Sequence, residues 1–158
     1  MKILFICTHN RCRSILSEAI CNHLAGAQLQ GFSAGSQPVG EVHPLSLKYL
    51  DEHGISTEGL RSKSWHEFEN NKPDIAITVC DSAANEACPV WFGDCVTLHW
   101  GLQDPSKLQG SDAEIKSAFY NVMSTIEQRV HALLALNLAD RPQTEWRDAL
   151  ARIIQEVN

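Results

Sequence analysis

Short apolar runs alternate along this chain with longer stretches in which apolar residues recur every three or four positions. The short runs predict four β-strands, at residues 3–6, 29–34, 74–80 and 95–98. The periodic stretches predict helices at residues 13–25, 44–53 and 111–136, with a further helix at 142–157. Strands that alternate with helices indicate an α/β fold, in which a mainly parallel sheet is covered on both faces.

Local signals support several of these boundaries. Pro44 suits the first turn of a helix, and Gly54 suits its end. Ser111 and Glu114 have the spacing of a capping box, which predicts a helix start there. The mixed polar stretch 55–72 has no clear periodicity, although Trp65 and Phe68 could anchor one short helical turn within it.

Composition narrows the class of protein. With 158 residues we expect one domain, 1–158, in which the segment 142–157 is an additional C-terminal helix. No run approaches the roughly 20 apolar residues of a membrane span, and the run after Lys2 is too short for an export signal, so we expect a cytoplasmic protein that binds no membrane. The net charge of −6 argues against nucleic acid as a partner.

The densest chemistry lies in the segment 7–14, which joins the first predicted strand to the first predicted helix. Unpaired backbone N–H groups and the positive end of the helix dipole converge at such a junction, and this geometry holds a tetrahedral oxyanion. Cys7 adds a nucleophile at the first position, and Arg13 adds a planar anion clamp. Ser14 could donate its hydroxyl to the Cys7 sulfur or only cap the helix.

Cysteine usage points to thiol chemistry. In the absence of an export signal, the six cysteines indicate thiols, metal ligands or redox groups instead of a disulfide framework. Cys7 and Cys80 both end predicted strands, and the carboxyl ends of parallel strands meet at one edge of a sheet. Cys88 follows Cys80 after seven residues, a spacing that does not match structural zinc sites, and we expect no metal. Cys21 and Cys95 are expected in the core.

Several motifs together resemble the low-molecular-weight phosphotyrosine phosphatase superfamily and, within it, the arsenate reductases. They are Cys7-Thr8-x-Asn10-x-Cys12-Arg13-Ser14, Ser33-Ala34-Gly35, the pair Cys80 and Cys88-Pro89, and His99-Trp100-Gly101-Leu102-x-Asp104-Pro105. The resemblance covers most of residues 1–136. It implies a single domain with a four-stranded parallel sheet flanked by helices on both faces. His9 departs from it, since relatives often carry glycine there.

The resemblance also implies a role for each site residue. Arsenate would be bound by the loop residues Thr8, His9, Asn10, Arg11, Cys12 and Arg13. Cys7 would attack it as a thiolate, with a pKa that the loop lowers, and Asp104 would protonate the leaving oxygen. Cys80 would then attack Cys7 and release arsenite, and Cys88 would resolve the second disulfide. Cys12 could instead form a protective disulfide with Cys7.

Cofactors and partners follow from the same resemblance. We expect a monomer with no tightly bound cofactor, which receives its electrons from thioredoxin or from glutathione and glutaredoxin. Some relatives bind potassium at the positions of Asn10, Glu18 and Ser33, where we expect a hydrogen-bond network here.

Two other functions stay open at this point. One is a low-molecular-weight tyrosine phosphatase, against which Ser106-Lys107 stands where those enzymes usually carry aromatic residues. The other is a thiol redox sensor or metal-binding module without turnover.

Overall fold

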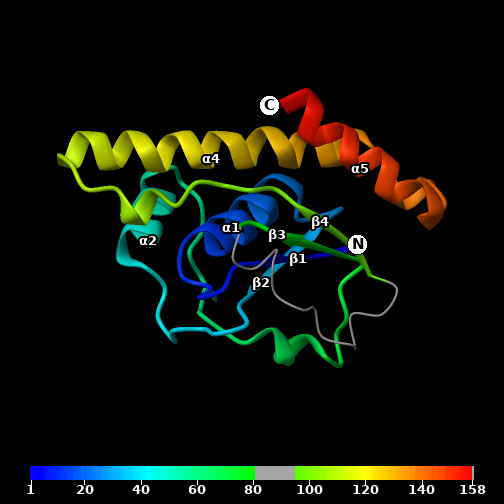
Figure 1. Ribbon diagram of the computed structural model, residues 1–158, viewed down its shortest axis with the longest axis horizontal. Helices are drawn as coiled ribbons and strands as arrows, with labels where there is room; N and C mark the ends of the chain where they lie inside the picture. Colours follow the sequence, from blue (N-terminus) through cyan, green and yellow to red (C-terminus); the bar gives the residue numbers. More distant parts are fainter. Residues whose placement is uncertain (81–94, 158) are drawn as a thin grey trace.

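The computed structural model describes residues 1–80 and 95–157, with side chains through residue 152. Four parallel strands form one sheet in the order β2-β1-β3-β4 (Figure 1). Their bounds are Lys2–Ile6 for β1, Gln30–Ala34 for β2, Ile75–Thr78 for β3 and Val96–His99 for β4. The predicted α/β fold with a four-stranded parallel sheet is therefore confirmed. Each strand begins and ends within two residues of its predicted bounds.

The register of the sheet brings the ends of its central strands together. Ile6 at the end of β1 pairs with Ala34 of β2 and with Thr78 of β3. The backbone N–H of Val79 continues this pairing by donating to the carbonyl of Ile6 at 2.9 Å. The residues that follow β1 and β3 consequently emerge side by side at one edge of the sheet.

The helices begin and end close to the predicted positions. Within residues 1–80 and 95–157, four helices are α-helical: α1 (Arg13–Ala25), α2 (Pro44–Glu52), α4 (Asp112–Ala135) and α5 (Gln143–Val157). The same residues form three short 3-10 helices: η1 (Trp65–Phe68), η3 (Pro105–Lys107) and η4 (Leu138–Asp140). Ser111 caps α4 as the capping box predicts, since its side chain accepts from the backbone N–H of Glu114. Trp65 and Phe68 are buried and anchor η1.

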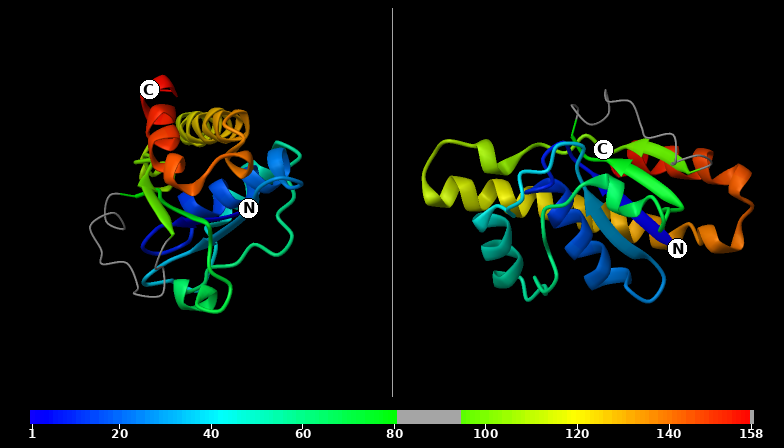
Figure 2. Two further views of the ribbon diagram at one scale, coloured as in Figure 1. Left: turned by 90° about the vertical axis from the view of Figure 1, so that its right-hand side faces the viewer. Right: turned by 90° about the horizontal axis from the view of Figure 1, so that it is seen from below.

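The two faces of the sheet are covered differently. The helices α1, α4 and α5 lie on one face (Figures 1 and 2). On the opposite face the ring of Phe32 in β2 packs edge-on against Phe68 of η1, with 5.5 Å between ring centroids. In the described residues, the long helices therefore lie on one face of the sheet. Phe5 of β1 and Ser33 of β2, which pair across the two strands, are on this face. None of the helices described here combines the length and the apolar character needed to cross a membrane.

The last helix packs on the outer part of the fold. Helix α5 contacts α4 and the edge strand β4, and Ala149 and Leu150 of α5 are buried in the core. Trp146 donates its indole N–H to the carbonyl of Leu138 at 2.9 Å, which fixes the start of the helix against η4. Cys21 is buried as predicted, whereas Cys95, which directly precedes β4, is only half-buried.

Candidate active site

The loop of residues 7–12 connects β1 to α1 and curls around the start of that helix. Asn10 has a φ of +49°, which asparagine tolerates better than most side chains, and this lets the chain reverse direction within the loop. His9 does not have a positive φ, so a histidine at this position, where the resemblance suggests glycine, does not strain the backbone. Gly35 lies directly below: a Cβ on it would stand 2.5 Å from the carbonyl oxygen of Thr8.

Cys7 and Cys80 lie together at the edge where β1 and β3 end. The Cys7 thiol hydrogen-bonds the Cys80 sulfur, and Cys80 Sγ also accepts from the backbone N–H of Thr8 at 3.4 Å. Both cysteines are buried. The predicted shared edge is therefore present for these two residues, whereas Cys88 lies outside the described residues.

The expectation that the loop lowers the pKa of Cys7 is wrong for this structure. The hydrogen bond with Cys80 and burial raise the pKa of the Cys7 thiol well above its ordinary value. The Arg13 guanidinium and the backbone N–H of His9 act in the opposite direction but have the smaller effect. The sequence motif carries the groups that favour a thiolate, and the tertiary contact with Cys80 outweighs them.

Arg13 and Asp104 lie face to face beside the loop. Arg13 Nη2 stands 3.5 Å from Asp104 Oδ2, and both side chains are about 15% exposed (15% and 16%). Arg13 Nη1 donates to the carbonyl of Leu102 at 3.0 Å, which orients the guanidinium plane. Arg13 Nε is buried and has no hydrogen-bond partner among the described residues. The guanidinium is thus oriented by the segment that carries Asp104 and keeps one buried donor for a ligand.

The segment that carries Asp104 is fixed to β3. The backbone N–H groups of Trp100 and Leu102 donate to the carbonyls of Thr78 and Val79 at 2.8 and 3.0 Å. Asp104 itself has extended backbone (φ −92°, ψ 102°), as expected before a proline, and it caps η3. Its Oδ1 accepts from both the backbone N–H and the hydroxyl of Ser106. Oδ2 is therefore the oxygen that faces Arg13.

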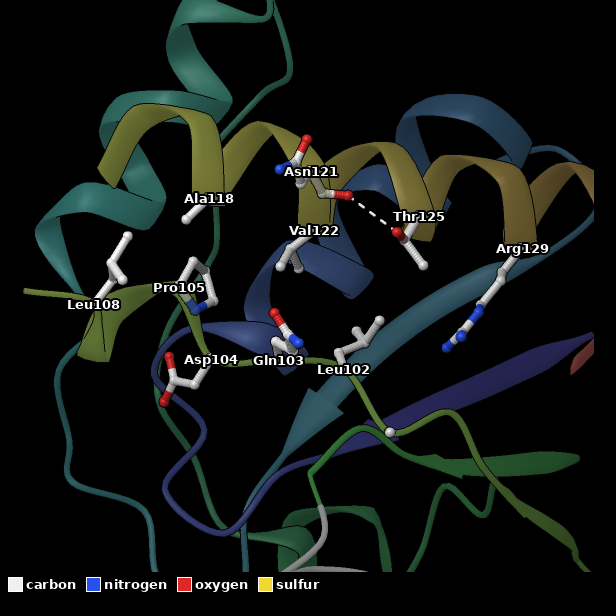
Figure 3. A pocket seen from close by; sticks show the side chains of 11 residues that line it. Leu102, Gln103, Asp104, Pro105, Leu108, Ala118, Asn121, Val122, Thr125 and Arg129 are labelled. Carbon is white, nitrogen blue, oxygen red and sulfur yellow. Dashed lines mark hydrogen bonds between the residues drawn. The ribbon is translucent and has the colours of Figure 1, made fainter. Parts of the chain in front are cut away.

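A cavity of about 380 Å³ lies between this segment and α4. Figure 3 shows Val122, Thr125 and Arg129 of α4 on one side of it and Leu102 and Pro105 on the other. The carboxylate of Asp104 points away from α4 in this view. The cavity consequently lies behind the Asp104 segment and is separate from the two cysteines.

Cys12 occupies a closed position at the start of α1. It is 2% exposed, and burial raises the pKa of its thiol to about 11, although Ser46 and Ser106 act in the opposite direction. The thiol therefore lies beside α2, which carries Ser46, and η3, which carries Ser106. A protective disulfide between Cys12 and Cys7 stays a prediction.

Comparison with known proteins gives this site a family. The family described as low molecular weight phosphotyrosine protein phosphatase matches residues 2–144 of the chain. An arsenate reductase from Halalkalibacterium halodurans is 33% identical over 128 residues, which are 81% of this chain and 91% of that protein. The chain belongs to the low molecular weight phosphotyrosine phosphatase family. Within this family it groups with the arsenate reductases, and it is an enzyme.

Two further members of the phosphatase family differ in the electron donor that their names give. A glutaredoxin arsenate reductase from Synechocystis is 28% identical and covers 85% of this chain and 96% of its own length. The solved structure of a thioredoxin-dependent arsenate reductase from Corynebacterium glutamicum superposes with a TM-score of 0.64 at 29% identity, over 85% of this chain and 60% of that one. The family match ends at residue 144, so almost all of α5 lies beyond it.

The potassium site that the sequence resemblance suggested at Asn10, Glu18 and Ser33 does not fit an ion in this structure. Ser33 Oγ donates to Glu18 Oε1 at 2.6 Å, and Lys63 Nζ lies 3.4 Å from each of these two oxygens. A second cation on the same oxygens would stand close to the ammonium, and two unit charges 4 Å apart repel by about 4 kcal/mol at an effective dielectric constant near 20. The hydrogen-bond network expected for Asn10, Glu18 and Ser33 is present.

Sequence analysis did not identify two residues that support this site. Lys63 lies in the polar stretch that shows no periodicity, and Arg129, on α4, donates to the carbonyl of Trp100. Arg129 interrupts the apolar face of its helix, and this interruption is the sequence signal that could have indicated a buried role. In the structure its side chain is 4% exposed. Asn10 Nδ2 donates to Ser14 Oγ at 2.7 Å, so Ser14 contributes to the loop, while Cys12 is the residue at the helix cap.

Proposed function

We propose that this enzyme reduces arsenate to arsenite through a disulfide relay of Cys7, Cys80 and Cys88, for arsenic detoxification in the cytoplasm. One observation carries the proposal: the sulfur of Cys80 is in hydrogen-bond contact with the thiol of Cys7 beside an oxyanion-binding loop. A phosphatase hydrolyses its cysteinyl intermediate with water and has no need of a second thiol at that position. A reductase has to supply two electrons, and a neighbouring thiol supplies them.

In the first step, arsenate binds against the loop and Cys7 attacks the arsenic atom. Backbone N–H groups at the start of α1 and the guanidinium of Arg13 would hold the oxyanion. Since contact with Cys80 raises the pKa of Cys7, ionisation is favoured once Cys80 Sγ moves off it, and Arg13 and the His9 N–H then stabilise the thiolate. A Cys7 sulfur–arsenic bond forms, and one arsenic–oxygen bond breaks.

The departing oxygen needs a proton, and Asp104 is the group proposed to give it. Oδ1 of Asp104 is already engaged by Ser106, so the proton would be carried on Oδ2 once Arg13 has turned from this oxygen to the bound oxyanion. The oxygen leaves as water, and the deprotonated carboxylate stays beside the guanidinium.

In the second step, the Cys80 thiolate attacks Cys7 Sγ. The Cys7–Cys80 disulfide forms, the sulfur–arsenic bond breaks, and its electron pair stays on arsenic, which leaves as arsenite. The contact between the Cys7 thiol and the Cys80 sulfur supports this step. Cys88 would next attack Cys80, release Cys7 as a thiolate and leave a Cys80–Cys88 disulfide for the external reductant. The names of the relatives support both thioredoxin and glutaredoxin as that reductant.

The test is arsenate reduction by the purified protein, with thioredoxin and its reductase supplied in one assay and glutathione with glutaredoxin in another. Multiple turnovers should occur with at least one of them. Cys88→Ser should release about one arsenite per protein and stop at a Cys7–Cys80 disulfide visible by mass spectrometry. Cys80→Ser should stop earlier, at arsenate-dependent modification of Cys7. Cys95→Ser is the matched control and should turn over normally.

Two results would contradict the proposal. Multiple turnovers by Cys80→Ser would exclude the relay. Hydrolysis of a phosphotyrosine analogue, together with no arsenate reduction in either assay, would identify a phosphatase instead. Weak phosphatase activity beside arsenate reduction fits the proposal, because the two reactions use the same oxyanion loop.

A further inference from the structure

A lysine is enclosed beneath the oxyanion loop. Lys63 is 8% exposed, and its ammonium donates to the carbonyl of Arg61 at 2.9 Å. The same ammonium lies 3.4 Å from Glu18 Oε1 and 3.4 Å from Ser33 Oγ. A buried ammonium destabilises the fold unless an opposite charge lies beside it, and the Glu18 carboxylate supplies that charge for Lys63.

The backbone of Lys63 reaches the loop directly. Its N–H donates to Asn10 Oδ1 at 2.8 Å, and its carbonyl accepts from the N–H of Gly35 at 2.9 Å. Asn10 is the residue with positive φ that reverses the loop, and it is fully buried. The position of the ammonium and the path of the loop are therefore set by one residue, whose side chain ties it to α1 and β2.

Burial lowers the pKa of the Lys63 ammonium, and Glu18 raises it again. Around the ammonium, the charged groups that face it are Glu18 of α1, Arg61 of the segment before η1, and Glu67 of η1. Glu67 is paired with Arg61, so Glu18 is the carboxylate left for Lys63. Lys63 and Glu18 therefore form a pair with one positive and one negative charge. The oxygens that would bind an ion, Glu18 Oε1 and Ser33 Oγ, are already in contact with the Lys63 ammonium.

We infer that Lys63 is a positioning residue: its ammonium takes the place of the cation that the resemblance suggested beside Asn10, Glu18 and Ser33, and it holds Asn10 and the loop amides in the conformation that binds an oxyanion. Oxyanion binding should then be independent of potassium. The inference deepens the proposed function, on which it rests for the identity of the oxyanion. Lys63 acts through the loop and touches no substrate.

The first experiment uses the unaltered full-length protein and inorganic phosphate as the probe. Phosphate affinity is measured by calorimetry in sodium, potassium and choline chloride at equal ionic strength. We expect the three dissociation constants to agree within about twofold, since the positive charge is covalently attached. Tighter phosphate binding in potassium than in sodium and choline would overturn the inference.

The second experiment replaces the lysine. Lys63→Met keeps most of the side-chain volume and should weaken phosphate binding by about tenfold or more, because the partly buried Glu18 carboxylate loses its ion-pair partner. Lys72→Met removes the same charge from an exposed position and should bind phosphate normally. In Lys63→Ala, methylammonium chloride should restore part of the affinity, while the larger tetramethylammonium should not. Normal phosphate binding by a folded Lys63→Met would overturn the inference.

Failure of this inference is distinguishable from failure of the proposed function, because phosphate binding needs no electron transfer. If the protein reduces no arsenate but Lys63→Met loses phosphate affinity, the proposed function fails. The role of Lys63 in holding the oxyanion loop is then supported for a phosphatase. If Lys63→Met does not fold, the comparison of salts with the unaltered protein decides: potassium independence supports the inference, and potassium dependence overturns it.

Discussion

The two sides of the oxyanion loop are held in different ways. On the underside, which we call the loop floor (Asn10, Glu18, Ser33, Gly35 and Lys63), hydrogen bonds of 2.6 to 2.9 Å join side chains and backbone, and the Lys63 ammonium adds contacts of 3.4 Å with Glu18 and Ser33. At the upper side, the loop mouth (Cys7, Arg13, Cys80 and Asp104), the contacts are to sulfur or within an ion pair: 3.4 Å from Thr8 N to Cys80 Sγ and 3.5 Å from Arg13 to Asp104.

This difference separates stability from chemistry. The floor fixes the direction of the backbone amides, and a change there should disturb folding as well as function. The mouth holds groups that have to exchange partners during a reaction, since Cys80 contacts Cys7 at rest and has to make way for an oxyanion. Changes at the mouth should therefore alter rates and leave stability nearly intact. The following variants test that separation.

The largest effect is expected at the mouth, from Asp104→Asn. The amide keeps the shape of the carboxylate but has no acidic proton to give, so the rate of arsenate-dependent Cys7 modification in a single turnover should fall by about 10²–10⁴-fold. The thermal unfolding midpoint should hardly change, because a pair at this distance contributes little. Asp51→Asn, on the exposed end of α2, is the control. An unchanged single-turnover rate would exclude Asp104 as the acid.

A large effect on stability is expected at the floor, from Gly35→Ala. The added Cβ would meet the carbonyl oxygens of Thr8 and Cys7 at 2.5 and 2.8 Å, and backbone atoms cannot move aside as a side chain can. Urea denaturation should show a loss of about 1–3 kcal/mol in the free energy of unfolding. Gly110→Ala is the matched control, because its Cβ would meet only the flexible carboxylate of Glu114. Equal stability of the two variants would show that the floor is not rigid.

A smaller effect is expected from Cys80→Ala. Since Cys80 raises the pKa of Cys7, its removal should lower that pKa, and the midpoint of Cys7 alkylation by iodoacetamide should move to lower pH. A shift of one pH unit gives about a tenfold larger thiolate fraction at neutral pH. Peptide mass spectrometry assigns the adduct to Cys7, and Cys95→Ala should leave the midpoint in place. A midpoint that stays or rises would mean that another group suppresses ionisation of Cys7.

The parts of the site that the sequence predicts are the parts that it encodes locally. Apolar runs define where β1 and β3 end, so the proximity of Cys7 and Cys80 follows from the parallel order of the strands. The proline after Asp104 likewise determines the extended backbone at that residue. Such features need only neighbouring residues and the general geometry of a sheet.

The features that the sequence does not predict depend on contacts between distant segments. Lys63 hydrogen-bonds Asn10 across 53 residues, from a stretch without periodicity. The direction of the Cys7 pKa depends on a cysteine 73 positions away, whose contact outweighs the loop's own charges. Burial and partner together determine both properties, and neither is written in a local motif.

The helix that extends past the family match also has a consequence for handling the protein. Helix α5 contacts β4, the outermost strand, and buries Ala149 and Leu150. A version that lacks α5 would expose the apolar surface of α4 and β4 that these residues cover, and large exposed apolar patches promote aggregation. Expression work should therefore keep the tail intact.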